Sequence, residues 1–413
     1  MNGARLAAIC GAVLFSHAAL AEPDNYVEAA RGKALITAGD CVACHTAPGG
    51  QSYAGGLALD TPFGAIMTPN LTPDPTTGLG NWTADDFYHA MHEGIGRDGQ
   101  HLYPAFPYTA FTKVTRADSD AIFAYLRTLP AVVNAVDRNS LPFPFDIRAA
   151  MIGWNALFFT PGTFTPDPKR SDEFNRGAYL VEGLGHCGTC HTPMNAFGAN
   201  KADVFLQANQ IDNWIAPNIT DDARLGLGAW SVEEIMQYLS TGQTANTVAS
   251  GPMADVIVHS TSQMPQTDLH AIAVYLKQRG AAGSATPAVL AASDPHMQSG
   301  AAIYVDTCAA CHTTSGAGIE HAFPRLAKDP AVQQDDPASL IRVVLAGTRA
   351  VATNAEPTAL AMPSLGYRLT DAQVADVLTY VRNSWGNAAA AVAASDVAKL
   401  RTEVGGPVNA ATP

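Results

Sequence analysis

The sequence has 413 residues, enough for about three compact domains at the usual size of about 100 to 200 residues each. Apolar residues make up 47% of the chain and charged residues 15%, a balance that excludes an intrinsically disordered protein. The formal net charge is -13, so the surface would repel phosphate backbones. We therefore expect no nucleic-acid partner.

The N-terminus is typical of an export signal. Arg5 precedes an apolar run from Leu6 to Phe15, and Ala19 and Ala21 are small residues of the kind found before a cleavage site. We expect residues 1–21 to be a cleaved signal peptide rather than an anchor, since this run is shorter than the about 20 residues that span a bilayer. No later run in the sequence reaches that length. The sequence therefore predicts a periplasmic protein that contacts the membrane only peripherally.

The cysteine pattern indicates covalent heme. After the signal, every cysteine belongs to a C-x-x-C-H motif, of which there are three. Residues i and i+3 of a helical turn share a face, so both thiols can bond one heme while the following histidine binds its iron. A zinc site would need two such pairs to converge, and a redox disulfide has no need of the histidine. The predicted attachment residues are Cys41, Cys44, Cys187, Cys190, Cys308 and Cys311, and the predicted iron ligands are His45, His191 and His312.

Internal repeats surround the three motifs. A similar helix opening begins before each motif, at Gly32, Gly177 and Gly300, and each repeat closes with an amphipathic helix. The closing helices are expected at Ala117–Leu126, Gln266–Leu276 and Thr370–Val381. This layout predicts a mainly α fold of three tandem cytochrome c domains with one covalent heme c each. The expected domains cover residues 22–160, 170–280 and 292–390, followed by a tail without a motif at residues 391–413.

Several segments outside the motifs resemble one family. They include residues 61–64 (TPFG), 102–108 (LYPAFPY), 250–254 (SGPMA) and 381–386 (VRNSWG). Together they resemble the tri-heme cytochrome c subunits of membrane-associated bacterial alcohol, gluconate or sugar, and aldehyde dehydrogenases. The resemblance implies a partner catalytic subunit that holds PQQ, flavin or molybdenum, and electron delivery to ubiquinone or another cytochrome. It also implies that this chain does no substrate chemistry itself.

Two other functions stay open at this stage. One is a peroxidase-like heme enzyme, which needs an open iron, and the first heme is the candidate. The other is a free soluble electron shuttle in the periplasm.

The second axial ligands are expected to be methionines, since electron-transfer hemes commonly carry His and Met. Met362 lies just before the last closing helix, and Met253 lies in the corresponding part of the second repeat, where the family motif favours it over Met264. The first repeat has Phe106 where many family members have methionine. We therefore expect Met67 to bind the first iron, with Met91 and His101 as alternatives.

An apolar run from Ala149 to Phe159 follows the first repeat and contains Trp154 and Phe158. It predicts either packing inside the protein or docking on a partner subunit or the membrane surface.

Overall fold

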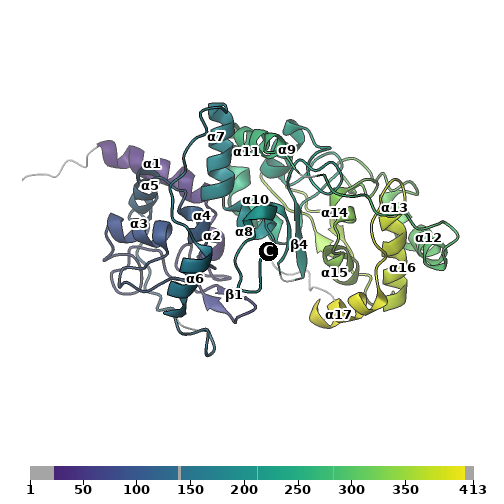
Figure 1. Ribbon diagram of the computed structural model, residues 1–413, viewed down its shortest axis with the longest axis horizontal. Helices are drawn as coiled ribbons and strands as arrows, with labels where there is room; N and C mark the ends of the chain where they lie inside the picture. Colours follow the sequence, from purple (N-terminus) through teal and green to yellow (C-terminus); the bar gives the residue numbers. More distant parts are fainter. Residues whose placement is uncertain (1–22, 138–140, 212, 282, 405–413) are drawn as a thin grey trace, which may run out of the picture.

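The computed structural model describes residues 23–137, 141–211, 213–281 and 283–404. The predicted signal peptide lies outside the described residues. We call residues 23–160, 161–291 and 292–404 the first, second and third segments, each of which holds one C-x-x-C-H motif. Helices dominate all three segments, so the prediction of a mainly α fold is confirmed. The segments follow one another along the long axis of the molecule (Figure 1).

In the first segment, helix α1 (Pro23–Ala38) leads into the short helix α2 (Cys41–Cys44), which carries the first motif. A two-stranded antiparallel hairpin follows, formed by β1 (Ala58–Leu59) and β2 (Ile66–Met67). Helices α3 (Ala84–Glu93), α4 (Tyr108–Phe111) and α5 (Arg116–Leu126) complete this unit. Helix α6 (Ala150–Phe158) comes after them, and none of its residues is buried.

The second segment repeats this order. Helix α7 (Asp172–Tyr179) runs into a π-helical turn, η1 (Leu180–Leu184), and then into α8 (Cys187–His191) with the second motif. The 3-10 turn η2 (Ala202–Val204) precedes an antiparallel hairpin, β3 (Gln207–Ile211) with β4 (Trp214–Asn218). The remaining helices are α9 (Val232–Thr241), α10 (Pro252–His259), the 3-10 turn η3 (Thr261–Gln263) and α11 (Gln266–Gln278).

In the third segment, α12 (Pro295–Thr307) precedes α13 (Ala309–His312), which carries the third motif. Helices α14 (Pro330–Gln333) and α15 (Ala338–Ala346), the hairpin of β5 (Thr348–Arg349) with β6 (Ala361–Met362), and α16 (Asp371–Arg382) follow. The described part of the predicted tail contains a further helix, α17 (Ala394–Val404), which packs on α15 and α16 with Val397 and Leu400 buried. The tail thus extends the core of the third segment.

Each segment is closed by the crossing of its first and last long helices, α1 with α5, α7 with α11, and α12 with α16. A glycine of the first helix lies at each crossing. A Cβ atom on Gly32, Gly177 or Gly300 would lie 1.8, 2.0 or 2.2 Å from a backbone oxygen of the last helix. Only a residue without a side chain allows this approach, which explains the glycines in the repeated helix openings.

The helices begin where the sequence supplies N-terminal caps. Thr83, Ser231 and Thr370 each accept a backbone N–H of the helix that follows, and a side chain three residues later bonds back to the cap residue. The three helices with this arrangement are α3, α9 and α16, and α3 and α9 occupy the same place in their segments.

The apolar core of the first segment is continuous with that of the second. One cluster joins Ile36 and Ile122 of the first segment to Leu180 and Leu269 of the second. The third segment has a core of its own, which includes Tyr304 and Val374. The first and second segments therefore pack as one unit, against which the third is docked.

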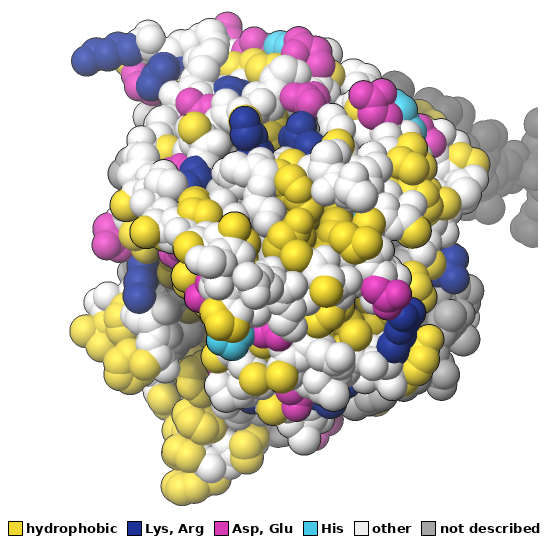
Figure 2. All heavy atoms as spheres, turned by 90° about the vertical axis from the view of Figure 1, so that its right-hand side faces the viewer, with side chains coloured by type: hydrophobic (Ala, Val, Ile, Leu, Met, Phe, Trp, Pro, Cys, Tyr) yellow, Lys and Arg dark blue, Asp and Glu magenta, His cyan; other side chains and the backbone are white. Residues whose placement is uncertain are grey.

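The end of the molecule formed by the third segment carries a mixed surface. Apolar side chains gather near the middle of this face, and acidic side chains lie mainly toward one edge (Figure 2). Val305, Ile319 and Tyr367 are among the exposed apolar residues of this segment. In the part of the chain that the structure describes, no helix is long and apolar enough to cross a bilayer.

Candidate functional site

The three motif histidines share one geometry. In each, the ring Nδ1 donates a hydrogen bond to the carbonyl oxygen of a proline: His45 to Pro69 at 2.8 Å, His191 to Pro217 at 2.7 Å and His312 to Pro324 at 2.9 Å. With its proton on Nδ1, the imidazole keeps the lone pair of Nε2 for a metal. The hydrogen bond to the proline carbonyl also fixes the plane of the ring.

Burial keeps these histidines neutral. Removal from water lowers the pKa of His45 to about 4, against the opposing effect of its bond to Pro69. Burial likewise lowers the pKa of His191 and of His312, again opposed by the proline carbonyl. A neutral imidazole is the form that binds iron.

The motif cysteines lie on single helical turns beside the histidines. Cys41 and Cys44 are the first and last residues of α2, and Cys187 and Cys190 lie in α8. In the third motif, Cys308 is the N-cap of α13 and Cys311 lies within that helix. Burial raises the pKa of Cys41 and of Cys187 to about 12, so these thiols lie in an apolar environment. Two thiols on one turn, followed by an imidazole with Nε2 free, fit the donor set of heme c.

Polar turns hold the first two proline carbonyls in place. The Oδ1 atoms of Asn70 and Asn218, which follow Pro69 and Pro217, accept the N–H of the residue two positions on at 2.9 and 2.8 Å. Asp74 and Asp222 then accept the N–H groups of the residues two and three positions on. The repeated Pro-Asn-x-Thr sequence is therefore the support of the histidine ring, a role that the sequence analysis did not assign.

Two of the predicted methionine ligands lie at the start of a helix and at the end of a strand. Met253 is the second residue of α10 and packs in a small apolar cluster with Ala249 and Val351. Met362 ends β6, opposite Thr348 of β5, and packs against the core of the third segment. The alternative in the second segment, Met264, is buried in the main core. Met253 and Met264 thus lie in different apolar clusters, and Met253 stays the predicted ligand.

Met67 lies elsewhere. It pairs with Ala58 in the first hairpin, two residues before the proline whose carbonyl binds His45. The strand that carries Met67 therefore leads directly to the carbonyl that binds Nδ1 of His45. Met67 stays a prediction as the second ligand of the first iron.

The first and second motifs are neighbours in space. Nε2 of His186, the residue before Cys187, donates to the carbonyl oxygen of Gly39 at 3.2 Å. The hydroxyl of Ser260, just after α10, approaches the carbonyl of Ala38 at 3.4 Å. The buried carboxyl of Asp40 lies here too, and burial together with the charge of Asp255 raises its pKa to about 8. The first two C-x-x-C-H motifs thus meet at one interface.

The second and third segments are joined beside the third motif. The backbone N–H of Arg325 donates to the carbonyl of Asn246, and that of His321 donates to Ala245, both at 2.9 Å. Arg325 directly follows Pro324, the partner of His312. The loop that orients the third histidine is therefore held by the second segment.

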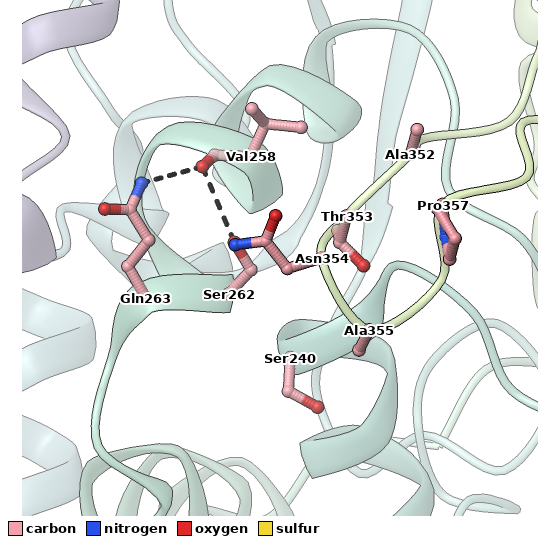
Figure 3. A pocket seen from close by; sticks show the side chains of 9 residues that line it. All are labelled: Ser240, Val258, Ser262, Gln263, Ala352, Thr353, Asn354, Ala355 and Pro357. Atoms are coloured by element: carbon pink, nitrogen blue, oxygen red, sulfur yellow. Dashed lines mark hydrogen bonds between the residues drawn. The ribbon is translucent and has the colours of Figure 1, made fainter.

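A pocket also opens between the second and third segments, formed by the end of α9, by α10 and η3, and by the loop at residues 352–357 (Figure 3). Gln263 and Ser262 donate to the carbonyl of Val258 at its edge. The residues that line it are uncharged and include none of the motif residues. This pocket is separate from the candidate heme sites.

Comparison with known proteins agrees with this geometry. The family model described as Cytochrome c matches residues 29–130 and 297–385. The gluconate 2-dehydrogenase cytochrome c subunit of Pantoea cypripedii is 41% identical over 420 residues, which cover 96% of this chain and 95% of that protein. The cytochrome c subunit of the alcohol dehydrogenase (quinone) of Gluconobacter oxydans (strain 621H) is 39% identical over 99% of this chain and 90% of its own length. The fructose dehydrogenase cytochrome subunit of Gluconobacter japonicus is 37% identical over 90% and 82%.

The helical fold and the Cys-Cys-His sites with their proline-bound imidazoles define a c-type cytochrome. Within that class, the chain belongs to the family of dehydrogenase cytochrome c subunits. The predicted resemblance is thus confirmed, and these relatives support an electron-transfer role.

Proposed function

We propose that this chain is an exported electron-transfer subunit with three covalent hemes c, attached at the three motifs. The observation that carries the proposal is the threefold recurrence of a motif histidine bonded through Nδ1 to a proline carbonyl. The count of three hemes and the three domains rest on this recurrence and on the sequence. The export signal supports a periplasmic location.

The partners follow from the relatives, whose names describe cytochrome subunits of gluconate, alcohol and fructose dehydrogenases. A separate catalytic subunit, of PQQ, flavin or molybdenum type, would oxidise the substrate. This chain would pass the electrons on to ubiquinone or another cytochrome. The contacts of His186 with Gly39 and of Arg325 with Asn246 bring successive sites together, as an electron relay requires.

The residues of this chain have defined tasks in such a relay. Heme supplies one-electron redox chemistry when bound. The paired cysteines hold it covalently, and Nε2 of His45, His191 and His312 would bind the iron. The proline carbonyls accept the Nδ1 protons and orient the rings. Cys41 and Cys187 pack against the apolar core that the first and second segments share.

Mass spectrometry of the purified chain tests the number of hemes. The expected mass is that of the apo chain cleaved after Ala21 plus three heme groups. Cys-to-Ala variants of single motifs should each remove one heme. A wild-type mass with fewer than three hemes contradicts the proposal. A subunit should copurify with a catalytic partner, and substrate should then reduce all hemes of the complex. A free shuttle should purify without such a partner.

We further propose that α6 docks the protein on the membrane surface. This helix contains no charged residue, and Ile152 and Leu157 are 57% and 76% exposed. Phe143, Phe145 and Ile147, just before it, are also exposed. Trp154 and Phe158 instead pack against the second segment, since the Trp154 indole N–H donates to the carbonyl of Phe197 and the Phe158 ring stacks on that of Phe197. An apolar helix fixed on one side and open on the other is suited to lie in a membrane interface.

The test of this docking replaces Ile152 and Leu157 together by serine and measures flotation of the full chain with phospholipid vesicles. We expect binding to the vesicles to fall while heme content stays the same. A matched control replaces Val305 and Tyr367, exposed apolar residues of the third segment, and should bind as wild type does. Unchanged flotation of the first variant, or loss of the catalytic subunit instead of the membrane, contradicts the proposal.

A further inference from the structure

The first and second segments are superposable around one loop. Both α3 and α9 end at a glycine in the left-handed region, Gly94 with φ 67° and Gly242 with φ 82°. The chain then forms an isolated bridge, between Ile95 and His101 in one segment and between Gln243 and Val248 in the other. A backbone bond closes each loop, from Leu102 N–H to Gly94 at 2.8 Å and from Ala249 N–H to Gly242 at 2.7 Å.

Counting the same number of residues from the bond that closes each loop identifies the residue of the first segment that corresponds to Met253. This methionine is four residues after Ala249, and the residue four after Leu102 is Phe106. Counted from the bond that closes each loop, Phe106 therefore has the position of Met253, although Met253 is the second residue of α10 and Phe106 precedes α4. The Phe106 side chain packs on the same core as Cys41 and Val42 of the first motif, and its ring lies 5.4 Å from that of Phe111. A phenyl ring has no lone pair for iron.

Met67 does not replace the missing ligand. It corresponds to Ile215, since both lie two residues before the proline that binds the motif histidine. Ile215 packs against the core of the third segment, and its N–H donates to Ser339, so this position faces away from the second motif. A side chain on the histidine side of a heme cannot reach the opposite face, because the macrocycle lies between them.

The two other candidates are occupied elsewhere or displaced. Met91 is buried between α3 and α5, and its sulfur is 4.0 Å from the hydroxyl of Ser119. Nδ1 of His101 is buried without a hydrogen-bond partner among the described residues, but His101 stands in the bridge at the place of Val248, five residues before the predicted ligand position. Its carbonyl accepts a bond from Arg148, which fixes the backbone five residues before Phe106.

We infer that the iron of the first heme has an open position behind Phe106, opposite His45, and that this position binds a small neutral diatomic ligand. This inference goes beyond electron transfer and rests only on the attachment of heme to the first motif. The phenyl ring of Phe106 supplies no hydrogen-bond donor and thus favours an uncharged apolar ligand over an anion. The net charge of -13 acts in the same direction.

Carbon monoxide is the probe, added to the dithionite-reduced full chain with its hemes attached. We expect one CO per chain in the optical difference spectrum. Phe106→Met should abolish this binding, since the introduced thioether occupies the sixth position and raises the potential of that heme. Phe106→Leu, which resembles methionine in size but has no sulfur, is the matched control and should still bind one CO.

A second variant keeps the test informative if Phe106→Met fails to attach heme. Met253→Phe copies the first loop into the second segment and should give two CO per chain. The inference is overturned if the reduced wild-type chain binds no CO, or if Phe106→Met binds as much as Phe106→Leu does. If CO binds only after Met67→Leu or His101→Ala, the altered residue is the sixth ligand and the inference is also overturned. Heme count by mass is independent of these outcomes.

Discussion

His186 donates a hydrogen bond from its Nε2 to the carbonyl oxygen of Gly39 at 3.2 Å, and so links the residue before the second motif to the backbone just before the first. His186 has φ 37°, in the left-handed region, and Asp40 has φ 50° at the equivalent position of the first segment. Both motifs thus begin from the same backbone bend, and the two bends lie against each other.

His186→Ala should weaken this junction. The carbonyl of Gly39 loses its donor, and the expected loss in the free energy of unfolding is about 1 kcal/mol. His186→Asn is the matched comparison, because asparagine tolerates the left-handed region and keeps an N–H donor. Chemical denaturation of the heme-loaded chain measures both. Equal stability of the alanine variant and wild type would show that the bond contributes nothing.

Gly177→Ala should destabilise the second segment by at least about 2 kcal/mol, because the added methyl would force α7 and α11 apart. The new Cβ would lie 2.0 Å from the backbone oxygen of Ala271. Gly162→Ala is the control, since no atom lies within 4 Å of a Cβ at that position. The thermal unfolding midpoint checks the difference. A variant at Gly177 as stable as the one at Gly162 would contradict the close crossing.

Asp74 should give the first segment an acid-sensitive turn. Its carboxylate accepts the N–H of Thr77 at 2.6 Å, the Thr77 hydroxyl at 2.8 Å and the N–H of Thr76 at 3.1 Å. The bonds from Thr77, the largest effect, hold the pKa of Asp74 below its ordinary value of 3.8. A depressed pKa in the folded state stabilises the protein above the ordinary value, and this stabilisation is lost as the pH falls through the folded value.

Asp74→Asn should therefore lower stability at pH 7 and have little effect in strong acid. Urea unfolding at both pH values measures this, and the curves of variant and wild type are expected to converge as the pH falls below 3.8. A difference that stays constant with pH would assign the effect of the substitution to the shape of the side chain rather than to its charge.

Arg382→Leu should unfold the third segment locally. The side chain is fully buried, and its guanidinium donates to the carbonyls of Ala390, Val332 and Gln334 at 3.0, 3.0 and 2.8 Å. Burial lowers the pKa of Arg382 to about 10, so it stays charged at neutral pH. Each carbonyl left without a donor costs about 1–3 kcal/mol. Hydrogen exchange should increase in α14 and α16 but not in α3, and uniform protection would contradict this.

Much of the fold could be predicted from short patterns. The expected closing helices match α5, α11 and α16 within two residues at each end, because their apolar spacing and caps are local features. The motif cysteines and histidines could likewise be selected from the sequence, because their spacing puts them on one helical turn. By contrast, the proline carbonyls come from residues 12 to 26 positions further along the chain, a pairing that no local pattern displays.

The tail and α6 show two further features that the sequence could not predict. Residues after 390 lack a motif, yet Val397 and Leu400 complete the core of the third segment, and Arg401 bonds to Asp371 and to the carbonyl of Gly366. In the apolar run at residues 149–159, some side chains pack against the second segment and others are exposed, and docking through the exposed ones stays a proposal. Trp154 packs against the second segment, whereas Leu157 faces solvent. Composition indicates that such a helix is apolar, but only tertiary contacts decide which of its sides is covered.

The peptide bond between Pro324 and Arg325 links the orientation of the His312 ring to the contact between the second and third segments. Its carbonyl oxygen, on Pro324, accepts a hydrogen bond from Nδ1 of His312. Its N–H, on Arg325, donates to the carbonyl of Asn246 in the second segment. A rotation of the third segment against the second would strain both bonds together and change how strongly the imidazole donates. If the third motif holds a heme, the redox potential of that heme would then vary with the angle between the segments, and a partner that fixes this angle would also set this potential.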